Sequence, residues 1–155
     1  PANINSPDQI VISGSKAAVE RAAELAKQKG AKRAVMLPVS APFHCSLMQP
    51  AQDRLAQDLR NLHFGTPAVP VATNVDAKFV KGGDVARDAL IRQVTGAVQW
   101  VRSIQLLIGS GVERFVEVGP GKVLTGLLRQ IDRSKTGLNV DNEESSQKTI
   151  AALAN

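Results

Sequence analysis

Short apolar runs alternate with amphipathic segments along this chain. Residues 9–13 (QIVIS) form a β-branched run that predicts a strand, and residues 16–29 are rich in alanine and glutamate, which favours a helix. Ser15 stands where an N-cap is expected and Gly30 where the helix would end. Residues 33–39 (RAVMLPV) predict a second strand, so the chain is expected to begin with a small β-α-β unit.

The next segment has the periodicity of a helix. Within residues 46–62 apolar side chains recur every three or four positions, which predicts an amphipathic helix with one buried stripe. The stripe consists of Met48, Ala51, Leu55, Leu59 and Leu62. Pro50 must lie in the first turn of this helix or kink it.

The alternation continues to the end of the chain. Strands are predicted at 69–74, 114–118 and 138–140, and helices at 84–94, 98–108, 123–131 and 146–153. Strands that alternate with helices indicate an α/β fold with a mainly parallel sheet.

Composition is that of one globular unit. A length of 155 residues allows one buried core, and 43% hydrophobic with 21% charged residues argues against wholesale disorder. The single cysteine excludes an internal disulfide and favours a reducing compartment. The start lacks the basic and apolar regions of a signal peptide, and no apolar stretch approaches the roughly 20 residues that span a bilayer. We therefore expect a cytoplasmic protein without membrane association.

The net charge of +5 favours an acidic partner. Nucleic acid is disfavoured, because the basic residues are scattered and neither zinc-ligand spacing nor an RNA-binding aromatic motif occurs. Lys32 and Arg33 adjoin a predicted strand, where they would either solubilise the protein or bind an acidic partner.

The strongest candidate for chemistry is His44, in the segment PVSAPFHCSLMQP (38–50). It follows a predicted strand and precedes a predicted helix, the position at which α/β sheets present functional side chains. An imidazole pKa near neutrality suits a general base, although a histidine that merely caps the helix would look the same. Cys45 is adjacent, but neighbouring side chains generally diverge, so it is interpreted as a small buried residue rather than a nucleophile.

Other candidates are weaker. GPGK (119–122) has neither the P-loop nor the dinucleotide-binding spacing and is interpreted as a tight turn, and His63 as a surface or rim residue. The nucleophile pentapeptide G-x-S-x-G does not occur, since SGS and GSG fall short of it. The residues alone thus supply a base without a nucleophile.

Several segments together resemble one family. NINSPDQIVISG, KRAVMLPVSAPFHCSLMQPA, NVDA, DALIRQVTGAVQW and VEVGPGKVLTGL are similar to the C-terminal half of malonyl-CoA:acyl carrier protein transacylases, in the family's order and over nearly the whole chain. The resemblance implies that residues 1–40 are part of a ferredoxin-like small subdomain and residues 41–155 the C-terminal part of an α/β-hydrolase-like large subdomain. The family's serine elbow, its carboxylate-binding arginine and one oxyanion-hole contributor lie in the N-terminal half and have no counterpart here.

The resemblance also implies roles for residues. His44 matches the catalytic histidine, which deprotonates the serine, protonates the departing CoA thiolate and then reverses these roles with the carrier-protein thiol. Gln93 matches the residue whose main-chain carbonyl holds the histidine ring in place of a triad aspartate. Phe43 matches the position before that histidine, where related acyltransferases often have Phe for malonyl and Ser for branched extenders, and it is expected to line the acyl pocket.

Residues outside the catalytic pair are implied to bind the substrate's arm and the carrier. The side-chain amides of Asn3, Asn5 and Gln9 border the cleft and are expected to bind pantetheine. Lys32 and Arg33 are expected to face the acidic carrier protein.

The implied activity is transfer of malonyl from CoA to the phosphopantetheine thiol of acyl carrier protein through an acyl-serine, in fatty acid biosynthesis. No metal or redox cofactor is implied, and malonyl-CoA enters as substrate. The expected partners are acyl carrier protein and the missing N-terminal half, without which the isolated chain is expected to be inactive. Two alternatives stay open: the acyltransferase domain of a larger fatty-acid or polyketide synthase, and a non-catalytic fragment that binds the carrier protein.

Overall fold

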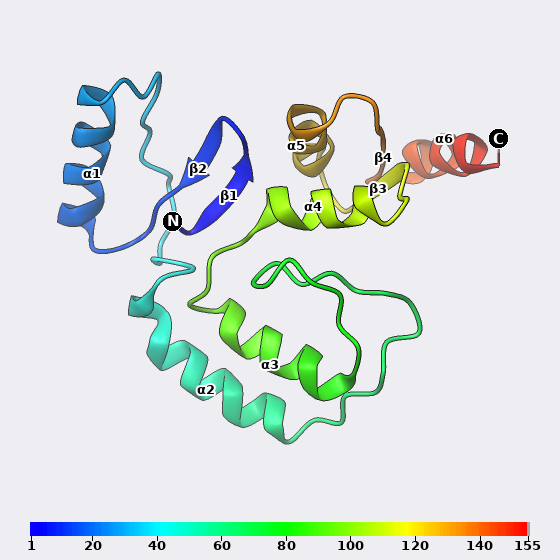
Figure 1. Cartoon of the computed structure of the whole chain (residues 1–155), viewed down its shortest axis with the longest axis horizontal. Helices are drawn as coiled ribbons and strands as arrows, with labels where there is room; N and C mark the ends of the chain where they lie inside the picture. The colour runs from blue at the N-terminus through cyan, green and yellow to red at the C-terminus, as the bar shows by residue number, and fades with distance from the viewer. Residues whose placement is uncertain (155) are drawn as a thin grey trace.

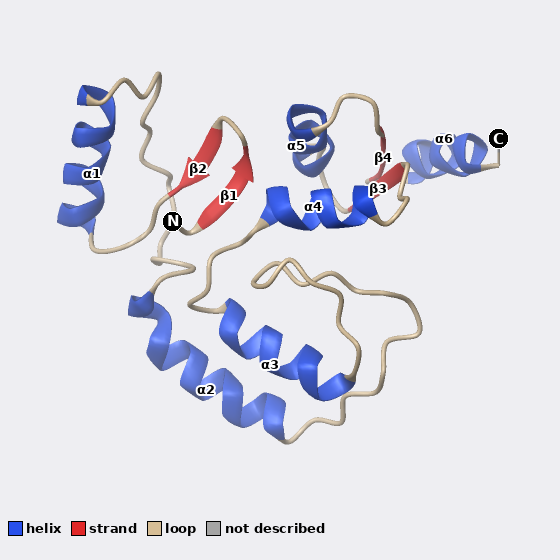
Figure 2. Ribbon diagram, viewed as in Figure 1, coloured by secondary structure: helices blue, strands red, loops and turns tan. Residues whose placement is uncertain are grey.

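Two small sheets and a set of helices make up residues 1–154, the part of the chain that the computed structural model describes (Figures 1 and 2). In order, the elements are β1 (Asn3–Ser6), β2 (Gln9–Val11), α1 (Lys16–Gln28), the 3-10 helix η1 (Ser46–Met48), α2 (Gln49–Arg60), α3 (Gly83–Gln93), α4 (Trp100–Gly109), β3 (Arg114–Val118), α5 (Val123–Ile131), β4 (Thr136–Val140) and α6 (Glu143–Leu153). Mixed helix and sheet confirm the α/β class.

The first sheet is an antiparallel hairpin of β1 and β2. The polar sequence NINS did not predict β1, because it lacks the β-branched run that marks strands. Besides β2, strand β1 has a second neighbour far along the chain. The Ile4 N–H donates to the Val98 carbonyl (2.9 Å), and the Val98 N–H donates to the Ala2 carbonyl (2.8 Å). The hairpin is thereby fixed to the segment between α3 and α4.

The second sheet pairs β3 with β4 in parallel, joined through α5, and α6 packs on β4. The predicted parallel arrangement is therefore right for this sheet and wrong for the hairpin. Helix α6 begins three residues before the predicted start, because Asn142 caps it. The Asn142 side chain accepts from the Ser145 N–H, and the Ser145 hydroxyl accepts from the Asn142 N–H (both 3.0 Å), which is a capping box.

Two predicted strands are wrong. Residues 33–39 are irregular, and residues 69–74 contribute only an isolated bridge between Ala72 and Phe79. A strand needs a neighbour for its backbone groups, and along 33–39 the one backbone hydrogen bond described runs from the Val39 N–H to the Leu37 carbonyl (2.9 Å). Their apolar sequence therefore meets no sheet within the described chain.

The expected helices form, with adjusted ends. Helix α1 has Ser15 at its N-cap position, although the Ser15 side chain makes no capping hydrogen bond there. Gly30 ends it as expected, with a φ of 94°. Pro50 lies in the first turn of α2, where its missing N–H is harmless. Helices α2 and α3 pack side by side (Figure 1).

The core is small for the apolar content of the chain. Buried apolar side chains are Ala2, Ala56, Val80, Ala89, Ile104, Leu127 and Leu128. The stripe predicted for α2 is only partly correct: Ala51 and Leu62 are exposed, the other three are half-buried, and the fully buried residue is Ala56. No helix among residues 1–154 is both long and apolar enough to cross a bilayer.

Candidate active site

His44 lies at the end of the irregular segment that leads into η1, and it is half-buried. Its φ of 60° is in the left-handed region, which residues other than glycine seldom adopt. Such backbone strain persists only where the surroundings hold it, and it concentrates at functional positions. The local backbone therefore supports a specific orientation for this side chain.

The imidazole is held by the end of another helix. His44 Nδ1 lies 3.0 Å from the main-chain oxygen of Gln93, the last residue of α3. A carbonyl oxygen only accepts, so Nδ1 carries the proton and donates, and the lone pair of the neutral ring is on Nε2. Nε2 makes no hydrogen bond to a described residue. The ring is thus fixed as a base whose acceptor nitrogen is available.

The turn after α3 leaves the Gln93 carbonyl available to the ring. The Gly96 N–H donates to the Arg92 carbonyl (2.8 Å), and the Gln93 side-chain amide donates to the Gly96 carbonyl (3.0 Å). The same Gln93 nitrogen is 3.4 Å from His44 Nδ1, but both atoms are donors in this tautomer, so the carbonyl contact is the one that orients the ring.

Gly96 is required by close packing in this turn. A Cβ at this position would lie 2.6 Å from Cγ2 of Val75 and 2.7 Å from the Arg92 carbonyl oxygen. One position earlier, the Thr95 hydroxyl donates to the side-chain oxygen of Gln52 on α2 (2.6 Å). The turn that holds His44 is therefore tied to the helix that follows His44 in sequence.

Sequence reasoning missed an ionic cluster beside Gln93. The Arg92 guanidinium donates to both Asp76 and Asp88. The hydrogen bond from Arg92 is the main cause that lowers the pKa of Asp76 below its ordinary range, against a smaller opposing effect of burial. Arg92 and Asp88 stand within the quoted segment DALIRQVTGAVQW and Asp76 within NVDA, but their spacing carries no signal that they meet.

The described hydrogen bond of the Cys45 thiol goes to the backbone and not to His44. Cys45 Sγ donates to the Pro42 carbonyl at 3.2 Å, and the residue is half-buried. The two neighbouring side chains thus have different partners, Pro42 for the thiol and Gln93 for the imidazole. His63, beyond the end of α2, is exposed, as predicted for a surface residue.

The GPGK segment is a tight turn, as predicted, with positive φ at Gly119 (138°) and Gly121 (89°). The N-terminus of α5 is already occupied by a carboxylate: Glu117 accepts from the N–H groups of Leu124 (3.0 Å) and Thr125 (2.8 Å) and from the Thr125 hydroxyl (2.8 Å). Desolvation raises the pKa of Glu117, but these hydrogen bonds together outweigh it and lower the pKa. A phosphate cradle at this turn would compete with the chain's own anion.

The remaining predicted site residues lie in two further places. Phe43 is half exposed beside His44. On the hairpin, the Asn5 side-chain amide donates to the Gln9 side-chain oxygen (3.1 Å), and Asn3 lies two residues from Asn5, opposite Val98. The structure therefore brings Asn5 on β1 and Gln9 on β2 together, in a hairpin whose strand β1 is bonded to Val98, five residues after Gln93.

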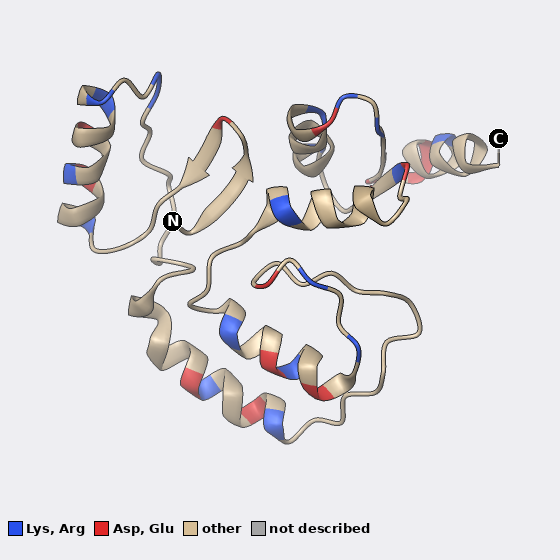
Figure 3. Ribbon diagram, in the orientation of Figure 1, with Lys and Arg blue, Asp and Glu red and all other residues tan. Residues whose placement is uncertain are grey.

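Lys32 and Arg33 are exposed in the loop after α1. Lys27 and Lys29 at the end of α1 precede them, and Figure 3 shows basic positions at this end of α1 and along the loop. None of the four forms an ion pair with a described carboxylate. No cluster of three or more His, Cys, Asp or Glu side chains suited to a metal ion is found in residues 1–154.

Comparison with known proteins gives one consistent result. Malonyl CoA-acyl carrier protein transacylases of Escherichia coli strain K12 and Bacillus subtilis strain 168 are 55% and 43% identical over 99% and 98% of this chain. The chain spans about half the length of these curated relatives, 49% and 48% respectively. No protein-family model matches the chain.

Solved structures agree. The malonyl CoA-acyl carrier protein transacylase of Coxiella burnetii matches with a TM-score of 0.96 and 44% identity, over 100% of this chain and 49% of that one. A malonyl-transacylase solved in complex with its type II polyketide synthase acyl-carrier protein matches with a TM-score of 0.95 and 43% identity, over 98% of this chain and 49% of that one.

Proposed function

Because the chain corresponds to the C-terminal half of the malonyl CoA-acyl carrier protein transacylase family, we propose that it supplies the general acid/base half of such an enzyme. The nucleophilic serine would come from the N-terminal half, which has no counterpart in these 155 residues. The proposed reaction moves malonyl from CoA to the thiol of acyl carrier protein.

Each proton in this reaction passes through His44. Nε2 takes the proton of the serine hydroxyl as the serine oxygen attacks the malonyl thioester, and His44 then protonates the departing CoA thiolate. In the second half, His44 takes the proton from the carrier thiol and returns it to the serine oxygen as the acyl-serine bond breaks. The base is regenerated, and neither metal nor redox chemistry is needed.

The observation that carries this proposal is the bond from His44 Nδ1 to the Gln93 carbonyl. It selects the tautomer in which Nε2 is basic, the role that a triad carboxylate plays elsewhere. A neutral carbonyl stabilises the imidazolium less than a carboxylate would, so the orientation of the ring matters correspondingly more.

Substrate binding is proposed for the hairpin and the residue beside His44. The amides of Asn3, Asn5 and Gln9 would bind the pantetheine arm, and Phe43 would line the acyl pocket. The backbone pairing of β1 with Val98 supports this, because it fixes the hairpin to the segment that also carries the His44 acceptor. Residues 1–40 would accordingly belong to the small subdomain and residues 41–155 to the large one.

Carrier-protein binding is proposed for the basic end of α1 and its loop. Lys32 and Arg33, with Lys27 and Lys29, form a surface without described ion-pair partners, which suits an acidic protein. That a matching structure is a transacylase in complex with its acyl-carrier protein supports the class of partner.

The missing half is the proposed partner of the exposed apolar side chains. Eight of them lie on the segment 33–39, the segment 69–74 and the strand β3, namely Val35, Met36, Leu37, Val39, Val69, Val71, Val116 and Val118. Val118 is 79% exposed although it ends a strand. Apolar surface of this extent favours burial against further protein.

The test compares this chain with a restored enzyme, in which it is fused to the N-terminal half of the Escherichia coli relative. We expect the restored enzyme to transfer malonyl from malonyl-CoA to acyl carrier protein, as followed by the mass of the carrier, and this chain alone to transfer none. Absence of transfer by a folded restored enzyme would refute the proposal, and binding of the carrier without transfer would favour the non-catalytic alternative.

A cytoplasmic location, favoured by the single cysteine, is part of the same proposal.

A further inference from the structure

We infer that Arg92 and Asp76 are positioning residues for His44: their ion pair fixes the last turn of α3, and this turn carries the carbonyl that orients the imidazole. The chemical role of His44 rests on the proposed function, whereas the inference about the contacts that orient its ring does not.

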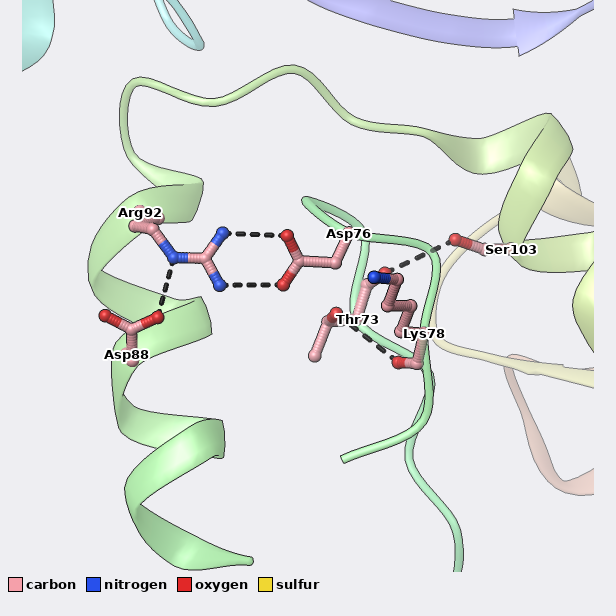
Figure 4. Close-up of polar contacts among 6 residues, drawn as sticks. All are labelled: Thr73, Asp76, Lys78, Asp88, Arg92 and Ser103. Atoms are coloured by element: carbon pink, nitrogen blue, oxygen red, sulfur yellow. Dashed lines mark hydrogen bonds and ion pairs between the residues drawn. The ribbon is translucent and has the colours of Figure 1, made fainter. Parts of the chain in front are cut away.

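The pair has the geometry of a fork on a fork (Figure 4). Arg92 Nη1 donates to Asp76 Oδ1 at 2.8 Å, and Nη2 donates to Asp76 Oδ2 at 2.7 Å. Its Nε donates to Asp88 Oδ2, one turn earlier on α3, at 2.7 Å. Two parallel charge-assisted bonds restrict both distance and angle, which one contact to a lysine would not do.

Asp76 belongs to a turn that is itself anchored. The Thr73 N–H donates to the Lys78 carbonyl (3.0 Å), the Ala77 N–H donates to the Thr73 carbonyl (2.9 Å), and Ala77 has a φ of 51°. The far side of this turn is tied to α4 and the residue before it: the Gln99 N–H donates to the Asn74 carbonyl at 2.8 Å, and the Ser103 hydroxyl contacts the Thr73 carbonyl at 3.5 Å (Figure 4). Asp76 is therefore presented from a fixed point rather than from a free loop.

The other end of the pair is next to the His44 acceptor. Arg92 and Gln93 are consecutive, and the Arg92 carbonyl is capped by the Gly96 N–H (2.8 Å) while the Gln93 carbonyl accepts from His44 (3.0 Å). A helix end has few backbone bonds to hold it, so its last turn frays easily. Fraying of this turn would lengthen the hydrogen bond from the His44 ring to the Gln93 carbonyl. The ion pair of Arg92, the residue before Gln93, opposes such fraying.

The charge of Asp76 is maintained by its partner. Hydrogen bonding from Arg92 lowers the pKa of Asp76, so the pair stays ionised throughout the neutral range. Both side chains are partly exposed, at 41% and 31%, so the pair adds little to global stability. A local effect on geometry is therefore the readout that separates positioning from a merely structural role.

The test reads the tautomer of His44 from the nitrogen-15 chemical shifts of the ring. The background is His63→Gln, which leaves His44 as the one histidine, and the pH is well above the ordinary imidazole pKa of about 6.5. The variants are Asp76→Asn, Arg92→Gln and Arg92→Lys. The matched control is Asp84→Asn, which removes an ion pair to Arg87 on the same helix at its other end.

We expect Nδ1 to be the protonated nitrogen in the parent. In Asp76→Asn and Arg92→Gln the two nitrogen shifts should move toward the averaged values of a freely exchanging ring. Arg92→Lys should be intermediate, and Asp84→Asn unchanged. Circular dichroism establishes that each variant is folded, and Arg92→Lys, which retains the cation, decides the matter if the neutral variants unfold.

The restored enzyme supplies the second readout. A misplaced base should lower kcat on the order of tenfold in Asp76→Asn and Arg92→Gln, with KM for malonyl-CoA unchanged. Unaltered His44 nitrogen shifts in these variants, or an equal shift in Asp84→Asn, would overturn the inference. If the restored parent transfers no malonyl, the proposed function fails while the nitrogen shifts still decide the positioning.

Discussion

The surroundings of His44 differ from the apolar segment 33–39, which precedes it in the sequence, in how many of their structural partners lie within this chain. His44 has its orienting acceptor, the acceptor's helix and the tie between α2 and the turn after α3 all within the described residues. Segment 33–39 has a strand-like sequence and exposed apolar side chains, yet no neighbouring strand among residues 1–154. The orientation of the base is thus fixed by contacts within the described residues, whereas the strand predicted before the base finds no partner strand among them.

The largest expected effect concerns the first region. Changing His44 to Ala in the restored enzyme should slow acyl transfer by roughly two to four orders of magnitude, because the serine loses its general base. Stopped-flow release of CoA measures the first half-reaction. The His63→Gln variant is the control and should react normally, since His63 is exposed. Near-normal transfer by His44→Ala would reduce the histidine to a packing residue.

The close packing behind His44 gives the second prediction. Gly96→Ala places a Cβ against Val75 and the Arg92 carbonyl, so the free energy of unfolding should fall by about 1–3 kcal/mol. Urea denaturation of this chain measures it. Gly65→Ala is the control, because a Cβ there meets no atom of the described residues within 4 Å. Equal stability of the two variants would show that the turn after α3 is not tightly packed.

The basic residues at the start of the second region give the third prediction. The double change Lys32→Glu and Arg33→Glu should raise KM for acyl carrier protein about tenfold in the restored enzyme, through slower association of the acidic carrier. KM for malonyl-CoA should stay constant. Lys81→Glu, an exposed lysine in a different loop, is the control. An equal rise for both thioester substrates would contradict docking of the carrier at this loop.

The smallest effect is a pH dependence at the junction of β3 with α5. The pKa of Glu117 is lowered on folding from its ordinary value of 4.5, so its carboxylate stabilises the fold above that pH, and the stabilisation is lost as the pH falls through the folded pKa. Urea midpoints of this chain should therefore decline in the acidic range, and less steeply in Glu117→Gln. The control is Glu24→Gln, which alters an exposed carboxylate on α1. Identical pH profiles for all three proteins would show that Glu117 does not contribute to the pH dependence of stability.

Sequence periodicity predicted the elements whose partners are local. Helix α3 and strand β3 were predicted to within a residue of their bounds, because their partners α2 and β4 lie within the described residues. The predicted strands at 33–39 and 69–74 were wrong for the opposite reason. Apolar β-branched residues favour the extended conformation, but a strand forms only beside another strand. The hairpin strand β1 was missed because its pairing, not its composition, makes it a strand.

The candidate site shows the same limit. His44 stood out by its place between a predicted strand and a helix, but the residues alone favoured a histidine that caps the helix. The acceptor role of Gln93 came from family resemblance, since a main-chain carbonyl leaves no mark in a sequence. Arg92 and Asp76 are 16 residues apart, and only the folded turn shows that their side chains meet.

Mapping of the malonyl adduct shows whether this chain holds an oriented base but not the nucleophile. Both this chain and the restored enzyme are incubated with malonyl-CoA, digested and analysed by peptide mass spectrometry. We predict no adduct on any of these 155 residues and one adduct on a serine of the added half. A malonyl group on Cys45, or on any serine of this chain, would contradict the account.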